Sequence, residues 1–301
     1  MAGESTGEIL KSLAVNVIIA VSKGVAAVLT GSGAMLAETL HSFADCGNQL
    51  LLLQGVRATR RPPDRAHPFG YGRAMYFYSF IVALLLFFGG GVFSIREGIH
   101  KMLEPEPVES VGIALFILLF SFLLEGWSTL GNIRELNKRR GDRPFFQFLK
   151  ETKDSDLIVV FGENSAAVLG LSFAMIALAL AKLTGDGHWD GAGSLAIGVV
   201  LVGVAAFLAR EVKSLLVGES ADKQMQQAIN QLAVDDPNVD EVLGMLTVQQ
   251  GPGEILVAMK LRMRGGLETS ELVAAINAFE RELKVRVPEV KWSFIEPDCA
   301  D

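Results

Sequence analysis

The 301-residue chain contains only two cysteines, Cys46 and Cys299, and only four histidines. Two cysteines this far apart are too few for a disulfide framework or a cysteine-rich zinc site. Positive charge is also in deficit, because 27 Lys and Arg residues face 34 Asp and Glu residues and leave a net charge of -7. A nucleic-acid-binding protein needs a basic face, so this balance argues against nucleic acid as a partner. Apolar residues, in contrast, make up 50% of the chain, which excludes a disordered protein.

The apolar residues are concentrated in six long blocks. These blocks cover residues 9–30, 34–56, 74–98, 111–131, 155–182 and 192–209. Each is near or above the ~20 residues that a helix needs to cross the hydrocarbon core of a bilayer. Six such blocks are too many to be buried together in one small core. The sequence therefore predicts an α-helical membrane protein with six transmembrane helices surrounded by a lipid bilayer.

The loops between the blocks differ strongly in charge. Residues 57–73 include five arginines and residues 132–154 include seven Lys or Arg residues, whereas the loop between the fifth and sixth blocks has neither. Cytoplasmic loops carry the excess of Lys and Arg, so we expect both termini in the cytoplasm. Met1–Gly7 is too short for a mitochondrial transit peptide, and we therefore expect a bacterial inner (plasma) membrane.

The composition changes after residue 212, where charged residues become more frequent and apolar runs shorten. Helical periodicity covers residues 221–234 and 268–285, and strand-like alternation covers 239–249, 255–263 and 291–295. The order α-β-β-α-β predicts a small α+β domain. We therefore divide the chain into a membrane domain over residues 1–212 and a cytoplasmic domain over residues 213–301.

Polar residues inside the blocks are candidates for function, because charge within a membrane is unfavourable and usually marks a pathway or a site. His41 and Asp45 are four residues apart, which places them on one face of a helix. An imidazole and a carboxylate both bind divalent transition metals, and both titrate, so metal and protons compete for them. The other polar residues of the blocks include Asn16, Lys23, Glu38, Asn48, Gln49, Glu125, Glu163 and Asn164.

The depth of these groups follows from helix geometry. Asp45 is 12 residues from Arg57, which is about 18 Å along a helix from the cytoplasmic end. Asn164 is 11 residues from Lys153, which is about 16 Å from that end. The second and fifth blocks thus place polar groups at similar depth, as a transport site shared by two helices requires.

Several other features of the blocks have structural interpretations. Lys23 either hydrogen-bonds a neighbouring helix or extends its ammonium toward the interface, with a functional role left open. We expect Glu38 and Glu125 to be structural and to lie near the outer and inner interfaces respectively. The run Gly89–Gly91 is expected to permit close helix approach or bending.

Two motifs resemble the cation diffusion facilitator family. Residues 37–49 read AETLHSFADCGNQ, similar to the family's second-helix motif with ligands four residues apart. Residues 64–73 read DRAHPFGYGR, similar to the family's D-x-x-H-P-x-G-(H/Y)-G-(K/R). The stretches at 253–260 and 294–298 are similar as well. The pattern ENSAAV at 163–168 resembles the branch that contains the animal mitochondrial zinc transporter.

The resemblance implies a homodimeric, proton-coupled exporter of divalent metal with a ferredoxin-like cytoplasmic dimerisation domain. It carries His41 and Asp45 over as metal ligands. The family's two ligand positions in the fifth block fall on Val160, which cannot bind metal, and Asn164, which offers a neutral carbonyl oxygen. Glu163 lies about 100° around the helix from Asn164. It is expected to supply the missing carboxylate if this helix is rotated or irregular.

The family also has a metal site in the loop that follows the second helix. Asp64 and His67 keep part of this second site, while Tyr71 stands where many members have a third ligand. The predicted cytoplasmic domain contains no histidine, so we do not expect it to sense metal. The clustered candidates near its end, for which we expect a structural role, are Glu296, Asp298 and Cys299.

Our hypothesis is efflux of a divalent metal, zinc first, by metal–proton antiport with alternating access. The transported ion is the only metal that we expect, and we expect no cofactor. Manganese, iron and cobalt stay open, because the site has fewer nitrogen and thiolate ligands than a tight zinc site. A non-transporting membrane partner or sensor with a decayed site is a further alternative. An enzyme is not expected, since neither a Ser or Cys nucleophile motif nor a three-ligand catalytic zinc set is visible.

Overall fold

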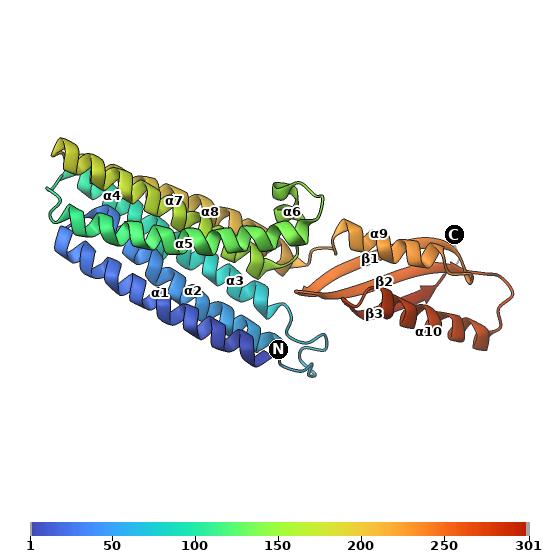
Figure 1. Cartoon of the computed structure of the whole chain (residues 1–301). Helices are drawn as coiled ribbons and strands as arrows, with labels where there is room; N and C mark the ends of the chain where they lie inside the picture. The colour runs from blue at the N-terminus through green and yellow to red at the C-terminus, as the bar shows by residue number, and fades with distance from the viewer. Residues whose placement is uncertain (1, 299–301) are drawn as a thin grey trace. The chain divides into compact units, whose positions relative to one another are not determined.

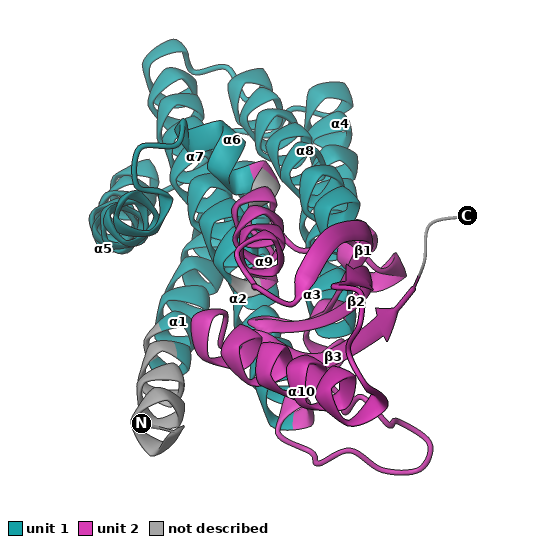
Figure 2. Cartoon of the chain, turned by 90° about the vertical axis from the view of Figure 1, so that its right-hand side faces the viewer, with its two compact units in different colours: residues 1–57, 77–149, 156–212 teal, residues 58–76, 150–155, 213–301 magenta. Residues whose placement is uncertain are grey.

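The computed structural model describes the backbone of residues 2–298 and the side chains of this range except those of residues 2–12, 15, 151 and 156. Cys299 lies outside the described residues. The chain forms two compact units, coloured teal and magenta in Figure 2. Unit 1 comprises Met1–Arg57, Phe77–Leu149 and Asp156–Val212, and unit 2 comprises Ala58–Tyr76, Lys150–Ser155 and Lys213–Asp301.

Unit 1 is a bundle of long helices that run side by side (Figure 1). Buried apolar residues from these helices, among them Met35, Leu118, Leu171 and Leu201, form one continuous core. The elements are α1 (Ala2–Thr30), α2 (Gly33–Thr59), α3 (Ala74–Leu85), a π-helix η1 (Leu86–Val92), α4 (Phe93–Leu103), α5 (Val111–Arg140), α6 (Phe145–Glu151), α7 (Ser155–Thr184) and α8 (His188–Val217).

The six predicted apolar blocks all fall on long helices within residues 2–298. Four of these helical stretches are long and apolar enough to cross a membrane, namely Ala74–Leu103, Val111–Arg140, Leu157–Thr184 and His188–Val217. The helix α1 contributes a shorter apolar stretch, Asn16–Thr30. The helix α2 is 27 residues long but less apolar, because it carries the polar side chains from Glu38 to Gln49. The predicted helical membrane fold is thus confirmed, and the helix with the candidate site, α2, is not among these four apolar stretches.

Glycines allow α8 to approach the helix formed by α3, η1 and α4 very closely. A Cβ added at Gly98 would lie 2.6 Å from the backbone nitrogen of Leu195, and one at Gly198 would lie 2.7 Å from that of Ile95. A Cβ at Gly91 would meet the backbone nitrogen of Val202 at 3.1 Å. The glycine run 89–91 therefore serves close helix approach, as its sequence predicts, and the wider turns of η1 coincide with it.

Unit 2 contains a three-stranded sheet with two helices on one face. Along the chain, its elements are α9 (Lys223–Val234), β1 (Val239–Gly251), β2 (Glu254–Met263), α10 (Thr269–Arg286) and β3 (Val290–Pro297). The sheet order is β1-β2-β3, with β1 and β2 antiparallel and β2 and β3 parallel. Parallel neighbours need a crossover connection, which α10 supplies. The predicted α-β-β-α-β order is confirmed.

The core of this small domain follows from the alternation of β2. Ile255, Val257, Met259 and Leu261 point to one face and are buried in the same cluster as residues of α9 and α10, such as Phe279. The opposite face of the sheet is open, and the side chains of Leu246, Lys260 and Phe294 are exposed there. Unit 2 therefore has one covered face and one uncovered face.

The loop between α2 and α3 belongs to unit 2. The ring of Phe69 packs edge-on against Trp292 of β3, with ring centroids 5.6 Å apart. Gly72 lies against Gly251, where an added Cβ would come within 2.7 Å of the Gly72 Cα. Because neither position has room for a side chain, two glycines are needed for this contact.

Candidate functional site

The helix α2 presents His41 and Asp45 one turn apart, as their spacing predicts. His41 Nδ1 and Asp45 Oδ1 are 3.5 Å apart, and the His41 side chain is fully buried while that of Asp45 is 17% exposed. Among the described residues, both ring nitrogens of His41 and Oδ1 of Asp45 have no hydrogen-bond partner. Unpartnered buried polar atoms are unfavourable, so such atoms in a native protein need an explanation. A cation that these nitrogen and oxygen lone pairs bind is one explanation.

The helix α7 contributes Glu163 to the same polar region. Glu163 Oε1 accepts a hydrogen bond of 2.5 Å from Asn48 Nδ2, one turn beyond the pair on α2. The backbone carbonyl of Asn164 accepts a 3.4 Å hydrogen bond from Thr129 on α5. The Glu163 side chain is thus joined to the polar face of α2 through Asn48.

His41, Asp45 and Glu163 are candidate metal ligands. Within the part of the chain that the structure describes, no three His, Cys, Asp or Glu side chains converge as they do in a closed metal site. His41, Asp45 and Glu163 nevertheless offer one nitrogen donor and two carboxylates from two facing helices.

A second buried cluster lies beside this site and was not predicted. Lys23 on α1 is fully buried, and its Nζ lies 3.1 Å from Glu38 Oε2 and 3.3 Å from Glu125 Oε1. The same ammonium donates a 2.9 Å hydrogen bond to Ser42 Oγ. The prediction that Glu38 and Glu125 lie at opposite interfaces is wrong, because both carboxylates reach one ammonium. The sequence contained a signal for this cluster, because three apolar blocks carry one cation and two anions between them. Charged side chains inside a membrane usually pair with one another.

The cluster connects four helices. Its members come from α1, α2 and α5, and Glu38 also packs against Gly170 of α7, where an added Cβ would collide with Glu38 Oε1. Thr129 donates a 2.7 Å hydrogen bond to the backbone carbonyl of Glu125. The buried charges therefore lie where the helices that carry the candidate site meet.

The opposite end of α2 is held by Asp190 of α8. Its carboxylate, on a residue that is 1% exposed, accepts hydrogen bonds from Ser32 Oγ at 2.5 Å, Gly33 N at 2.6 Å and Ala34 N at 3.2 Å. A carboxylate at a helix N-terminus satisfies free N–H groups and interacts favourably with the helix dipole. Asp190 thereby fixes where α2 begins, and with it the position of His41.

Asp190→Ala is expected to lower the stability of the membrane unit by about 2 kcal/mol, because three buried donors lose their acceptor. Thermal unfolding of the detergent-solubilised protein measures this loss. Asp186→Ala is the matched control, since the Asp186 carboxylate is half exposed and pairs with His188 of its own loop. Equal unfolding temperatures for the two variants would contradict the role of Asp190.

The loop residues Asp64 and His67 lie together, but Asp64 is already engaged. Its Oδ1 accepts the backbone N–H groups of Ala66 at 2.9 Å and His67 at 2.7 Å, and its Oδ2 accepts the Tyr71 hydroxyl at 2.7 Å. The hydrogen bond from Tyr71, with those from the backbone, lowers the pKa of Asp64. The His67 and Tyr71 rings stack with centroids 4.3 Å apart. These contacts give Asp64 a structural role in shaping the loop.

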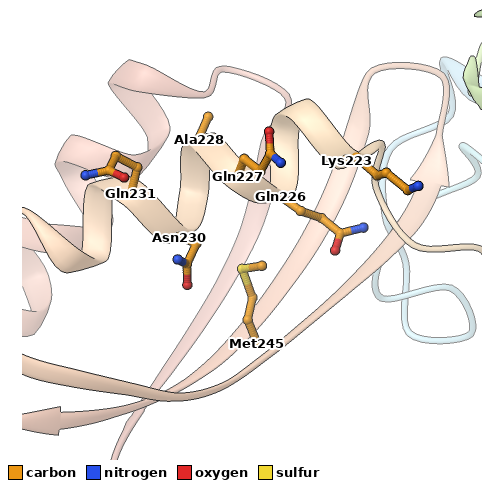
Figure 3. A pocket seen from close by; sticks show the side chains of 7 residues that line it. All are labelled: Lys223, Gln226, Gln227, Ala228, Asn230, Gln231 and Met245. Atoms are coloured by element: carbon orange, nitrogen blue, oxygen red, sulfur yellow. The ribbon is translucent and has the colours of Figure 1, made fainter.

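The acidic residues near the end of unit 2 also have partners. Lys260 Nζ lies 2.9 Å from Asp298 Oδ2 and 3.6 Å from Glu296 Oε1. A separate pocket lies between α9 and β1 (Figure 3), and it is lined by amide side chains such as Gln226 and Asn230 and by Met245. The residues drawn there carry neither carboxylate nor imidazole groups, so this pocket has none of the usual metal ligands.

Comparison with known proteins identifies a family for this chain. Residues 9–217 match the family described as cation efflux transmembrane domain. The chain is 34% identical over 244 residues to the mitochondrial proton-coupled zinc antiporter SLC30A9 of Xenopus laevis, covering 80% of this chain and 44% of that protein. It is 30% identical over 293 residues to the human protein of the same name, covering 95% and 51%.

A plant protein is similar as well. Metal tolerance protein C4 of Arabidopsis thaliana is 29% identical over 238 residues, covering 78% of this chain and 52% of that protein. The chain spans about half the length of these curated relatives. The family match, in contrast, covers most of the chain and includes both α2 and α7. The chain therefore belongs to the cation efflux family and is a multi-pass integral membrane protein.

Proposed function

We propose that this protein exports a divalent metal cation, zinc first, in exchange for protons. The observation that carries the proposal is the pair His41 and Asp45 on α2, whose buried ligand atoms have no hydrogen-bond partner among the described residues. The Glu163 carboxylate joins the same polar face from α7 through its hydrogen bond from Asn48. The similar animal proteins are described as proton-coupled zinc antiporters, which supports both the cargo and the exchanged ion.

The exchange follows from the chemistry of the three groups. An imidazole nitrogen and two carboxylates bind metal only when they are unprotonated, so metal and protons displace one another. In the state open to the cytoplasm, metal binds and protons leave. In the state open to the other side, protons bind to the same groups and release the metal. The protein needs only to expose one site to the two sides in turn.

The ligand types favour zinc and leave other metals open. Zinc binds imidazole and carboxylate ligands and has no preferred geometry of its own. Manganese, iron and cobalt also bind such nitrogen and oxygen donors, and none of the three residues offers a thiolate. The metal ranking in the flux experiment described below decides among them.

We further propose a homodimer with both termini on the cytoplasmic side of a bacterial inner membrane. The Lys and Arg excess in residues 57–73 and 132–154 supports this orientation. In this proposal residues 1–212 transport the ion and residues 213–301 provide a cytoplasmic dimer contact. The exposed apolar side chains of Leu246 and Phe294 on the open face of the sheet support such a contact.

Proton flux out of sealed liposomes that contain the full chain and a pH-sensitive dye, driven by zinc added outside, tests the function. Manganese, iron(II) and cobalt are added in turn for comparison. Glu163→Gln is expected to lower the zinc-driven flux at least about tenfold, because the site loses one of its two carboxylates. Asn164→Ala, on the neighbouring residue, is the control and is expected to change the flux little.

Two results would change this assignment. A large loss in Asn164→Ala with a small one in Glu163→Gln would place the asparagine oxygen in the site. Zinc binding without flux for any metal would instead favour the non-transporting partner or sensor. That alternative rests on Val160 and Asn164 at the two positions where the resemblance implies ligands. Val160 has no ligand atom, and Asn164 offers only a neutral carbonyl oxygen.

A further inference from the structure

The buried ammonium of Lys23 has no part in the proposed exchange, although it lies beside the site. Three oxygen atoms surround it within 3.3 Å, one each from Glu38, Ser42 and Glu125. An ammonium has three N–H donors and no acceptor, so each donor has one oxygen to bind. The ammonium therefore occupies a closed oxygen cage contributed by α2 and α5.

The cage adjoins the transport site on α2. Ser42, which accepts a hydrogen bond from Lys23, is the residue that directly follows His41. Glu38 is fully buried, and its Oε1 has no hydrogen-bond partner among the described residues. Glu38 Oε1 is therefore an acceptor atom beside the cage that the Lys23 ammonium does not use.

Removing the ammonium would leave two carboxylates and a hydroxyl facing one position. Carboxylate and hydroxyl oxygens bind divalent cations, and two carboxylates balance the charge of one such ion. The cage without Lys23 would accordingly be a second cation site, one helical turn from His41 on α2. In the wild type the Lys23 ammonium occupies this position, and it cannot dissociate because it is covalently attached to α1.

We propose that Lys23 is a tethered cation that occupies a second cation position and thereby restricts divalent metal to the site at His41 and Asp45. The proposal rests on the proposed function for the identity of the cargo. It makes Lys23 a specificity-determining residue, which sets how many metal ions the membrane unit holds. It also accounts for two glutamates inside the membrane that bind no transported ion.

The number of zinc ions bound per chain tests the proposal. The full chain in detergent is dialysed against zinc, and bound zinc is counted by elemental analysis. Lys23→Met, which keeps the length but removes the charge, is expected to bind one zinc more per chain than the wild type. Lys23→Arg keeps a cation and is expected to match the wild type. Because only the difference counts, zinc bound elsewhere cancels.

A third variant identifies the extra site. Lys23→Met combined with Glu38→Gln is expected to return to the wild-type zinc count, because the cage then has one carboxylate. A folded Lys23→Met protein with the wild-type count would overturn the proposal. Lys23→Gln is the second neutral variant if Lys23→Met does not fold. If neither folds even with zinc present during purification, Lys23 is structural and the proposal fails.

The same measurement separates this proposal from the proposed function. Asp45→Asn is expected to remove the transported zinc from the wild-type count. Combined with Lys23→Met, it is expected to keep the extra zinc in the cage. A wild-type protein without zinc in the membrane unit would refute the proposed function. An extra zinc in Lys23→Met would still support the tethered cation.

Discussion

Asp45→Asn is expected to lower zinc-driven proton flux at least about 100-fold. Replacing a residue that only orients a metal ligand lowers activity by about 10- to 100-fold, so the loss of a ligand itself should be at least as large. The substitution keeps the shape of the side chain but removes the carboxylate charge and its ability to exchange a proton for metal. Asp45 is the member of the α2 pair that is partly accessible, whereas His41 is fully buried. Flux in liposomes and zinc binding in detergent measure the two effects separately.

Glu135→Gln is the matched control for this variant. Glu135 is an exposed acid on α5 that pairs with Arg139, so its neutralisation removes a carboxylate from the same unit without touching the site. Its flux is expected to stay near the wild-type value. If Asp45→Asn transports as well as this control, then His41 and Asp45 are not the exchange site.

Gly198→Leu is expected to destabilise the membrane unit by about 3 kcal/mol, or roughly 10 °C in unfolding temperature. An added Cβ at this position would meet two atoms of the neighbouring backbone, Ile95 N at 2.7 Å and Gly91 O at 2.9 Å. Backbone atoms cannot turn aside as the end of a flexible side chain can, so α8 must move away from α4. Thermal unfolding in detergent measures the effect.

The same helix provides the control for this prediction. Gly203 also lies within α8, but an added Cβ there would have no neighbouring atom within 4 Å. Gly203→Leu carries the same change in helix propensity and is expected to unfold close to the wild-type temperature. Similar losses in both variants would mean that the effect comes from the helix itself and not from its contact with α4.

Local patterns in the sequence predicted most of the fold. The alternation around Ile255 and Met259 identified β2 and the face that it buries, because successive side chains of a strand point to opposite faces. The apolar blocks identified the long helices for a similar reason, since their length matches the bilayer. The pairing of His41 with Asp45 was predictable too, because residues four apart on one helix meet without any other element.

Contacts between helices were harder to predict. The depth of a residue along its own helix gives the position of its Cα, but the long side chains of Lys23 and Glu125 reach beyond it. Glu38 was therefore placed at an interface although it shares an ammonium with Glu125. The rotation of α7 is likewise set by its neighbours, so sequence left Glu163 and Asn164 as alternatives. In the structure Asn48 donates a hydrogen bond to the Glu163 side chain, and the flux of Glu163→Gln against Asn164→Ala tests which of the two is the ligand.

The loop over residues 58–76 has a consequence for protein engineering. Because this loop folds with residues 213–301, the C-terminal segment is not an interchangeable module that can be cut off at residue 212. A chimaera that exchanged only the C-terminal segment would deprive Phe69 of Trp292 and Gly72 of the backbone of Gly251. A chimaera with a relative should therefore take both segments from the same protein, so that the residues that replace Phe69 and Trp292, and those that replace Gly72 and Gly251, come from one sequence.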